Sequence, residues 1–169
     1  MRYRVLSFVA LLVILQIAFS AGFDAGLPHV LIDEVTVRPC AWLVRNLLGD
    51  ASAVAHGASV VASGATMKVL YGCEGSEVAI LLVAALLVAP MRPWRRIAGI
   101  LAGLVFVFAL NQARLVVLFL ALSDWHEGFG ALHGVVMPVV MVVAVLLYFL
   151  AVLRSGQASA SAPLPAGGT

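Results

Sequence analysis

The chain has few charged residues, and this scarcity is its most informative absence. Only 11% of the 169 residues are charged, whereas soluble domains carry about 25%. There is no CxxC pair of a thiol–disulfide oxidoreductase, no HExxH and no zinc-ligand spacing among the four histidines. The basic residues are dispersed, which gives nucleic-acid binding no support. We therefore expect no metal, no cofactor and no nucleic-acid partner.

Apolar sequence is abundant instead. Hydrophobic residues make up 63% of the chain and the mean hydropathy is +1.11, which indicates an integral membrane protein. A membrane-spanning helix needs roughly 17–25 apolar residues, and four segments are predicted to span: residues 5–23, about 72–91, 97–122 and 132–153. The second is the weakest, because its strictly apolar part covers only residues 78–91. The prediction is an all-α polytopic membrane fold with about four transmembrane helices.

Basic residues in short flanks predict which side of the membrane is cytoplasmic. Six arginines fall on one side of the predicted spans: Arg2, Arg4, Arg92, Arg95, Arg96 and Arg154. We therefore expect a multi-pass protein of the plasma (inner) membrane with both termini in the cytoplasm. Residues 1–22 also fit a cleavable signal peptide, although we favour a retained anchor.

The segment 24–71 is then the only sizeable part outside the membrane. Residues 28–48 mix apolar and charged positions at helical spacing around Pro39, which predicts one or two short interfacial helices. Two β-prone runs separated by Ser63-Gly64 predict a small hairpin that leads into Cys73.

Two further segments complete the expected organisation. Residues 123–131 are predicted to form a short outer loop between the last two spans. A single membrane domain would cover residues 1–154, and the small, polar, Pro/Gly-rich residues 155–169 would form a disordered cytoplasmic tail. Gly99 and Gly103 form a GxxxG pattern, a weak helix-packing signal.

Arg114 interrupts the apolar run 97–122. A charge at the bilayer centre costs roughly 2.5–3.5 kcal/mol, so such a residue usually marks a site. Counting about 1.5 Å per residue from Ile97, we expect Arg114 near the outer boundary of its span. Cys73 enters the second span, and His133 opens the fourth, from that same side. The topology thus predicts a thiol, a guanidinium and an imidazole at one depth.

These three groups are the parts of a thiol acyl-transfer site. A neighbouring cation favours the thiolate nucleophile, histidine transfers protons near neutral pH, and arginine can stabilise an oxyanion. Asn111 lies three residues before Arg114 and therefore shares its helix face, where it would orient the guanidinium or the substrate. Gly72 and Gly75 would let a substrate backbone approach closely.

The segments YGCEGSE (71–77), NQAR (111–114) and LHG (132–134) resemble the Cys, Arg and His motifs of the exosortase/archaeosortase family. The resemblance implies a membrane cysteine transpeptidase that cleaves C-terminal sorting signals of exported, membrane-anchored proteins and transfers the new carboxyl end to a surface acceptor. With four spans rather than about eight, the chain resembles a compact member. It also has Glu74 where the family often has serine.

Other interpretations remain open on the sequence alone. Cys73 could pair with Cys40 in a disulfide, since both would face an oxidising compartment. Arg114 could snorkel to the interface, and His126 is the reserve for His133. Two further functions are a non-enzymatic membrane assembly subunit and a hydrolytic membrane cysteine protease.

Overall fold

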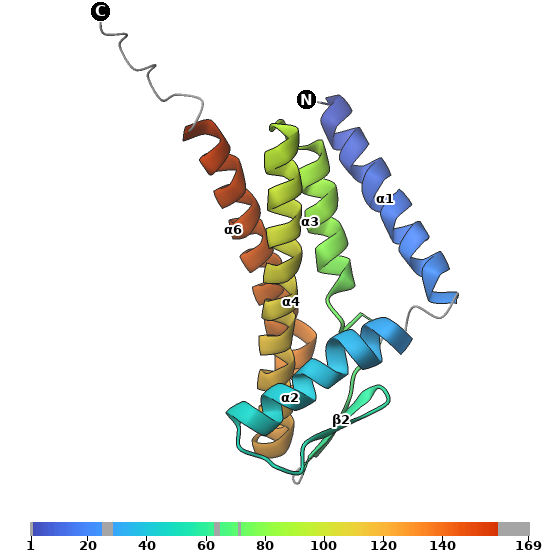
Figure 1. Cartoon of the computed structure of the whole chain (residues 1–169), viewed down its shortest axis with the longest axis vertical. Coiled ribbons are helices and arrows are strands. Elements are labelled where there is room, and N and C mark those ends of the chain that lie inside the picture. The colour runs from blue at the N-terminus through green and yellow to red at the C-terminus, as the bar shows by residue number, and fades with distance from the viewer. Residues whose placement is uncertain (1, 25–28, 63–64, 71, 159–169) are drawn as a thin grey trace, which may run out of the picture.

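The computed structural model describes residues 2–24, 29–62, 65–70 and 72–158, and helices dominate this part of the chain (Figure 1). The helices are α1 (Arg2–Asp24), the π-helix η1 (His29–Val37), α2 (Arg38–Leu47), α3 (Ser76–Val88), α4 (Pro93–Asp124), α5 (His126–Ala131), the π-helix η2 (Leu132–Val136) and α6 (Met137–Ala158). The strands are β1 (Val54–His56), β2 (Ser59–Ala62) and β3 (Ala65–Lys68).

The helices α1, α3, α4 and α6 run lengthwise, and α2 lies across one end of them with the small sheet (Figure 1). We call this the sheet end. The start of α1 and the finish of α6 lie at the opposite end, which we call the terminal end (Figure 1). Three helical segments are long and apolar enough to cross a membrane: Val5–Gly22, Pro93–Asp124 and Glu127–Ser155. The prediction of a polytopic helical membrane protein is thus confirmed.

The second predicted span corresponds to α3, which is apolar but only 13 residues long. At about 1.5 Å per residue it extends roughly 20 Å, less than the hydrocarbon thickness of about 30 Å. The helix begins at Ser76 rather than near Gly72 because Gly75 is left-handed, with φ 82°, and a right-handed helix cannot include that conformation. The cysteine turn therefore precedes a short helix within the bundle.

The helices α3, α4 and α6 share a bundle core formed by Leu82, Leu86, Val107, Met141 and Val145. Gly99 and Gly103 of α4 lie where the neighbouring helices come closest. A Cβ on Gly103 would lie 2.7 Å from Leu82 Cδ2 and 3.0 Å from Tyr148 Cε1. The Tyr148 hydroxyl donates a hydrogen bond of 2.7 Å to the Gly99 carbonyl. The GxxxG pattern thus marks a real packing contact within the chain.

A second core, the sheet-side core, joins the outer segment to α4. It contains the buried face of α2, strand residues and one face of α4: Val37, Cys40, Val44, Val60, Met67, Leu115, Leu118 and Phe119. The strands pair antiparallel in the order β1-β2-β3. The predicted hairpin corresponds to β2 and β3, which pair from Ser59↔Lys68 to Ala62↔Ala65, although its Ser63-Gly64 connection lies outside the described residues. Strand β1 was not predicted.

The interfacial helical prediction for residues 28–48 is realised by η1 and α2, which follow each other without a gap. Pro39 does not end the helical stretch: it lies in the first turn of α2, at the junction with η1. The prediction of a loop at 123–131 is wrong. α4 extends to Asp124, only Trp125 departs from helical geometry (φ −141°, ψ 63°), and α5 follows at once.

The expected tail begins later than residue 155, since α6 continues to Ala158. The remaining residues of the predicted tail, 159–169, lie outside the described part of the chain.

Candidate functional site

Cys73 lies in a turn between β3 and α3. Gly72 (φ 86°) and Gly75 (φ 82°) flank it, and both have left-handed backbones that favour glycine. The Cys73 N–H donates a 3.0 Å hydrogen bond to the Leu70 carbonyl, which closes the turn. The side chain is half-buried and packs against the sheet-side core. The local sequence thus fixes the thiol at the entrance of a helix.

Asn111 of α4 packs directly against this turn. A Cβ on Gly75 would lie 3.1 Å from Asn111 Cγ and 3.3 Å from its Oδ1. The asparagine is 2% exposed, and its Oδ1 accepts no hydrogen bond from the described residues. Only glycine fits at position 75 without displacing this amide, so the predicted supporting residues Gly75 and Asn111 are in contact.

Arg114 lies one turn further along α4, on the same face as Asn111. It is 9% exposed, and its Nε has no hydrogen-bond partner among the described residues. Its guanidinium is close enough to His133 for the two to interact electrostatically. The two predicted residues, 19 positions apart in sequence, are therefore within electrostatic range of each other.

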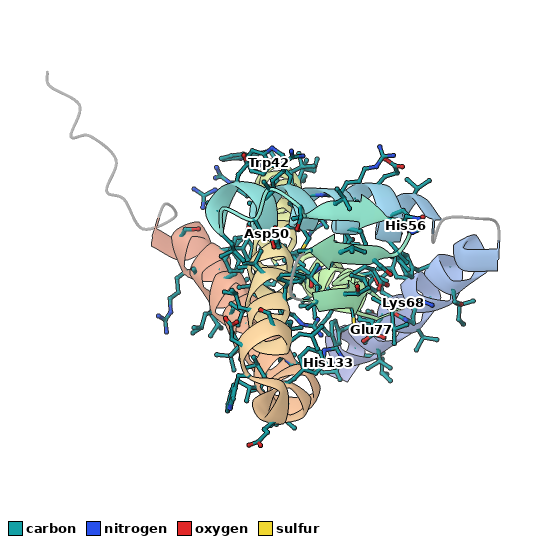
Figure 2. All side chains as sticks on the ribbon, turned by 90° about the horizontal axis from the view of Figure 1, so that it is seen from below. Trp42, Asp50, His56, Lys68, Glu77 and His133 are labelled. Carbon is teal, nitrogen blue, oxygen red and sulfur yellow. The ribbon has the colours of Figure 1, made fainter. Side chains whose placement is uncertain are left out.

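His133 belongs to η2, the π-helical turn between α5 and α6. Its ring is stacked on Phe129 of α5, with centroids 5.6 Å apart and an interplanar angle of 3°. Its Nδ1 is buried and finds no partner in the described part of the chain. Figure 2 views the molecule from the sheet end and shows His133 at the opposite edge from Trp42. Phe129 thus fixes the ring while leaving a nitrogen available.

The helix α4 connects these contacts. Asn111 contacts the cysteine turn, and Arg114, one helical turn further along, lies within electrostatic range of His133. Cys73 and Leu132, the residue before His133, both border the sheet-side core. α4 thus presents a guanidinium on the same helix face that contacts the thiol-bearing turn.

Cys40 has a different environment. It is fully buried in α2 within the sheet-side core, and burial raises the pKa of its thiol to about 12. Both cysteines are free thiols, so the alternative disulfide is not formed in this structure. Cys40 is a packing residue and Cys73 is the more accessible thiol.

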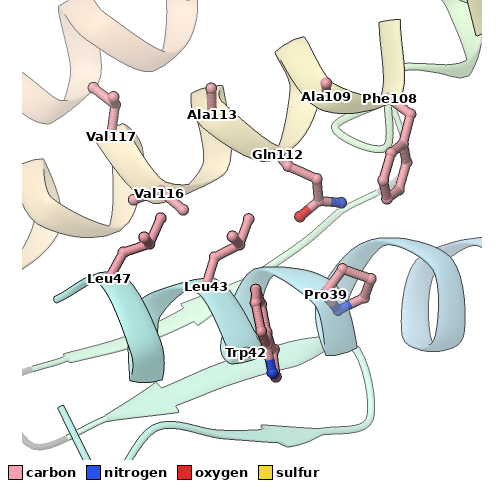
Figure 3. Close-up of a pocket in the computed structure, with 10 residues that line it drawn as sticks. All are labelled: Pro39, Trp42, Leu43, Leu47, Phe108, Ala109, Gln112, Ala113, Val116 and Val117. Atoms are coloured by element: carbon pink, nitrogen blue, oxygen red, sulfur yellow. The ribbon is translucent and has the colours of Figure 1, made fainter. Parts of the chain in front are cut away.

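Sequence reasoning missed a structural role for Gln112. Its side chain is 4% exposed, and its Nε2 donates to the Val35 and Thr36 carbonyls at 3.5 and 3.3 Å. Figure 3 shows it pointing from α4 toward α2, at an apolar cavity of about 620 Å³ between the two helices. The two hydrogen bonds of Gln112 link η1 to α4. The signal in the sequence was a glutamine within an apolar run.

The sequence showed Glu74 as a departure from the family motif, but it did not predict the burial of its carboxylate. Its Oε1 accepts a 2.6 Å hydrogen bond from the Ser76 hydroxyl, while its Oε2 is buried with no partner among the described residues. The signal was the carboxylate itself, at a position where serine was expected. Within the described ranges, no three His, Cys, Asp or Glu side chains gather where a metal could bind.

The fold is that of a polytopic helical membrane protein in which a cysteine turn contacts α4, and an arginine of α4 acts electrostatically on a histidine of η2. A model of the transmembrane exosortase family (Exosortase_EpsH) matches residues 2–150, and the chain belongs to this family. Its members are generally cysteine transpeptidases, and membership suggests a role in processing sorting signals. No curated protein and no solved structure matches the chain.

Proposed function

We propose that this protein cleaves the C-terminal sorting signals of exported, membrane-anchored proteins through a thioester at Cys73, and transfers the acyl group to a surface acceptor. Family membership supports the class of reaction. The observation that supports the assignment of residues is the contact of Asn111 with the cysteine turn, together with Arg114 one helical turn further along α4 within electrostatic range of His133.

In the first half-reaction, the Cys73 thiolate attacks the scissile carbonyl carbon. A C–S bond forms, and the π electrons of the carbonyl move to its oxygen, where the Arg114 guanidinium stabilises the negative charge. The C–N bond then breaks as His133 donates a proton to the departing amine. The products are a thioester on Cys73, a released tail and a neutral imidazole.

In the second half-reaction, an acceptor amine attacks the thioester carbonyl and His133 accepts its proton. The C–S bond breaks, the thiolate is regenerated and a new amide joins substrate and acceptor. The two half-reactions together balance in protons and electrons, because His133 regains in the second the proton that it donated in the first. Water in place of the amine would give a free carboxylate instead.

We place this chemistry at the outer face of the inner membrane, with both termini in the cytoplasm. Arg92, Arg95, Arg96 and Arg154 flank helix ends at the terminal end of the bundle, as the positive-inside rule requires of a cytoplasmic side. The Arg95 Nη1 donates a 2.9 Å hydrogen bond to the Ser155 carbonyl, which links α4 and α6 there. The substrate's own membrane helix would lie in the bilayer beside α3, α4 and α6.

The direct test is co-expression with a reporter whose C-terminus carries a short motif, an apolar span and a basic tail taken from the same genome. Processing by the wild type should be lost in Cys73→Ala and kept in Cys40→Ala. Equal loss in both variants would contradict the assignment of Cys73 as nucleophile, because it would indicate a shared structural role.

The fate of the acyl group is read from the product. Mass spectrometry of the new C-terminus should find it joined to an amine-bearing acceptor. A free carboxylate on every processed molecule would instead identify a hydrolytic membrane cysteine protease. An unprocessed reporter with every variant, wild type included, would favour the non-enzymatic assembly subunit.

A further inference from the structure

A cavity of about 270 Å³ lies beside the cysteine turn, among α1, η1, α3 and α4. Glu74, Gly75 and Ser76 form its border on the side of the turn. The rest of its wall is mostly apolar and includes Leu31, Val35, Ile80, Leu104 and Phe108. Ligand pockets for small molecules measure roughly 300–1,000 Å³, so this space suits one side chain rather than a larger molecule.

Glu74 supplies the charged group of this cavity. Its Oε1 is satisfied by the Ser76 hydroxyl, but its Oε2 is buried and accepts no hydrogen bond from the described residues. Nor does any described cation form a salt bridge with it. A buried carboxylate oxygen is costly when it lacks a donor. The carboxylate of Glu74 therefore keeps one oxygen for which the described residues provide no donor.

A purely structural role for Glu74 does not explain its partial burial. A carboxylate near the start of α3 is favoured by the helix dipole, but Glu77 in the first turn already provides that charge from an exposed position. The dipole does not require Glu74 to be partly buried beside a cavity, nor does it account for its oxygen without a donor.

We infer that Glu74 and this cavity bind a substrate side chain with an apolar stem and a cationic N–H donor, of the lysine or arginine type, next to the scissile bond. The stem would contact the apolar wall, and the cation would form a charge-assisted hydrogen bond with Oε2. The inference rests on the proposed function, because Glu74 directly follows Cys73 and a side chain held there belongs to a residue at the cleavage point.

The test measures occupancy rather than turnover. The full-length protein in detergent is alkylated with iodoacetamide, and the rate at Cys73 is followed by peptide mass spectrometry. Two probes compete with the reagent: N-acetyl-lysine methylamide and N-acetyl-norleucine methylamide, which share an aliphatic stem and differ in the ammonium group. The lysine probe should protect Cys73 at about a tenfold lower concentration than the norleucine probe.

Glu74→Gln removes the charge with little change of shape and should reduce this ratio to about one. Glu77→Gln removes an exposed carboxylate one turn away and should leave it unchanged. Buried Cys40 reports folding, because it should stay unlabelled in every folded variant. Equal protection by both probes in the wild type, no protection by either, or a preference that survives Glu74→Gln would each overturn the inference. None of these results depends on processing, so the loss of processing in Cys73→Ala tests the proposed function separately.

Discussion

Six buried side-chain atoms lack hydrogen-bond partners in the described chain: Glu74 Oε2, Arg96 Nε, Asn111 Oδ1, Gln112 Oε1, Arg114 Nε and His133 Nδ1. Three of them, on Asn111, Arg114 and His133, belong to the predicted site residues. Buried polar groups are normally satisfied, so a cluster of exceptions needs an explanation. A site that awaits a substrate provides one, since the substrate's peptide groups would supply the missing partners. The same cluster would destabilise a protein that used these residues only for packing.

Replacing Arg114 by leucine separates these two roles. The change removes a buried charge from an apolar helix, so the fold should be unchanged or more stable. Processing should fall by about 100-fold or more, because the oxyanion loses its stabilising group. Melting temperature in detergent and processing of the tailed reporter are measured together.

The matched control is Arg96→Leu, which removes an arginine from the other end of α4, where its Nη2 donates a 3.2 Å hydrogen bond to the Ala89 carbonyl. It should keep processing and lose a little stability. A strong loss of stability in Arg114→Leu would instead support a structural arginine.

The two thiols should differ sharply in their response to pH. Burial raises the pKa of Cys40 to about 12, so the folded protein keeps this proton well above pH 9. Near pH 8.5 maleimide should therefore label Cys73 and leave Cys40 untouched until the protein is denatured.

The raised pKa of Cys40 also determines the direction in which stability changes with pH. The unfolded chain releases the Cys40 proton near pH 9.0 while the folded chain holds it to about 12. Stability should therefore fall as the pH rises from about 9 toward 12, and Cys40→Ala should remove this pH dependence. Denaturant melts at pH 8 and pH 10.5 measure it, and rapid labelling of Cys40 in the folded state at pH 8.5 would contradict it.

At the scale of elements, the cysteine turn depends on Gly75. Alanine there must adopt φ 82° and bring its Cβ to 3.1 Å from Asn111 Cγ. The left-handed backbone alone costs about 1–2 kcal/mol, and the amide must also move. We expect Gly75→Ala to lower stability by about this amount and to reduce processing more than this loss explains.

Gly49→Ala is the control for this prediction, because Gly49 has φ 72° but no atom within 4 Å of an added Cβ. It should carry the conformational cost while leaving processing unchanged. Equal effects on processing in the two variants would show that the contact with Asn111 is unimportant.

The elements also show what sequence can and cannot predict. Long apolar runs predicted α1, α4 and α6, because membrane insertion depends on composition and length. Strand β1 escaped prediction, because its three residues are exposed and carry no alternating pattern; pairing with β2 defines it. Helix α5 was not predicted, because Gly128 and Gly130 on their own indicate a loop. In the structure, the aromatic ring of Trp125 covers Gly128.

For the site, sequence predicted its residue types and their common side of the membrane, but not their contacts. The contact of Gly75 with Asn111 depends on how α3 crosses α4, and that crossing follows from packing at Gly103 and Leu82. The burial of the Glu74 oxygen could not be predicted from the sequence either, since burial depends on how the helices pack together.

The whole molecule consists of a helical bundle with the sheet-side core attached to one end, and the site lies where they meet. This arrangement predicts opposite exposure of its two ends. In a Cys40→Ala, Cys73→Ala background, a cysteine at exposed Ala51 should react with a membrane-impermeant maleimide in spheroplasts. A cysteine at exposed Pro90 should react only after permeabilisation. The reverse pattern would invert the proposed topology.

Covalent capture of the intermediate tests the central claim most directly. The wild-type protein is mixed with a tailed substrate, quenched in acid and mapped by mass spectrometry before and after hydroxylamine. We predict a substrate acyl group on Cys73 that hydroxylamine removes, present in Cys40→Ala and absent in Cys73→Ala. Substrate cleaved with no adduct on Cys73 at any time, or an adduct on another residue, would contradict the account.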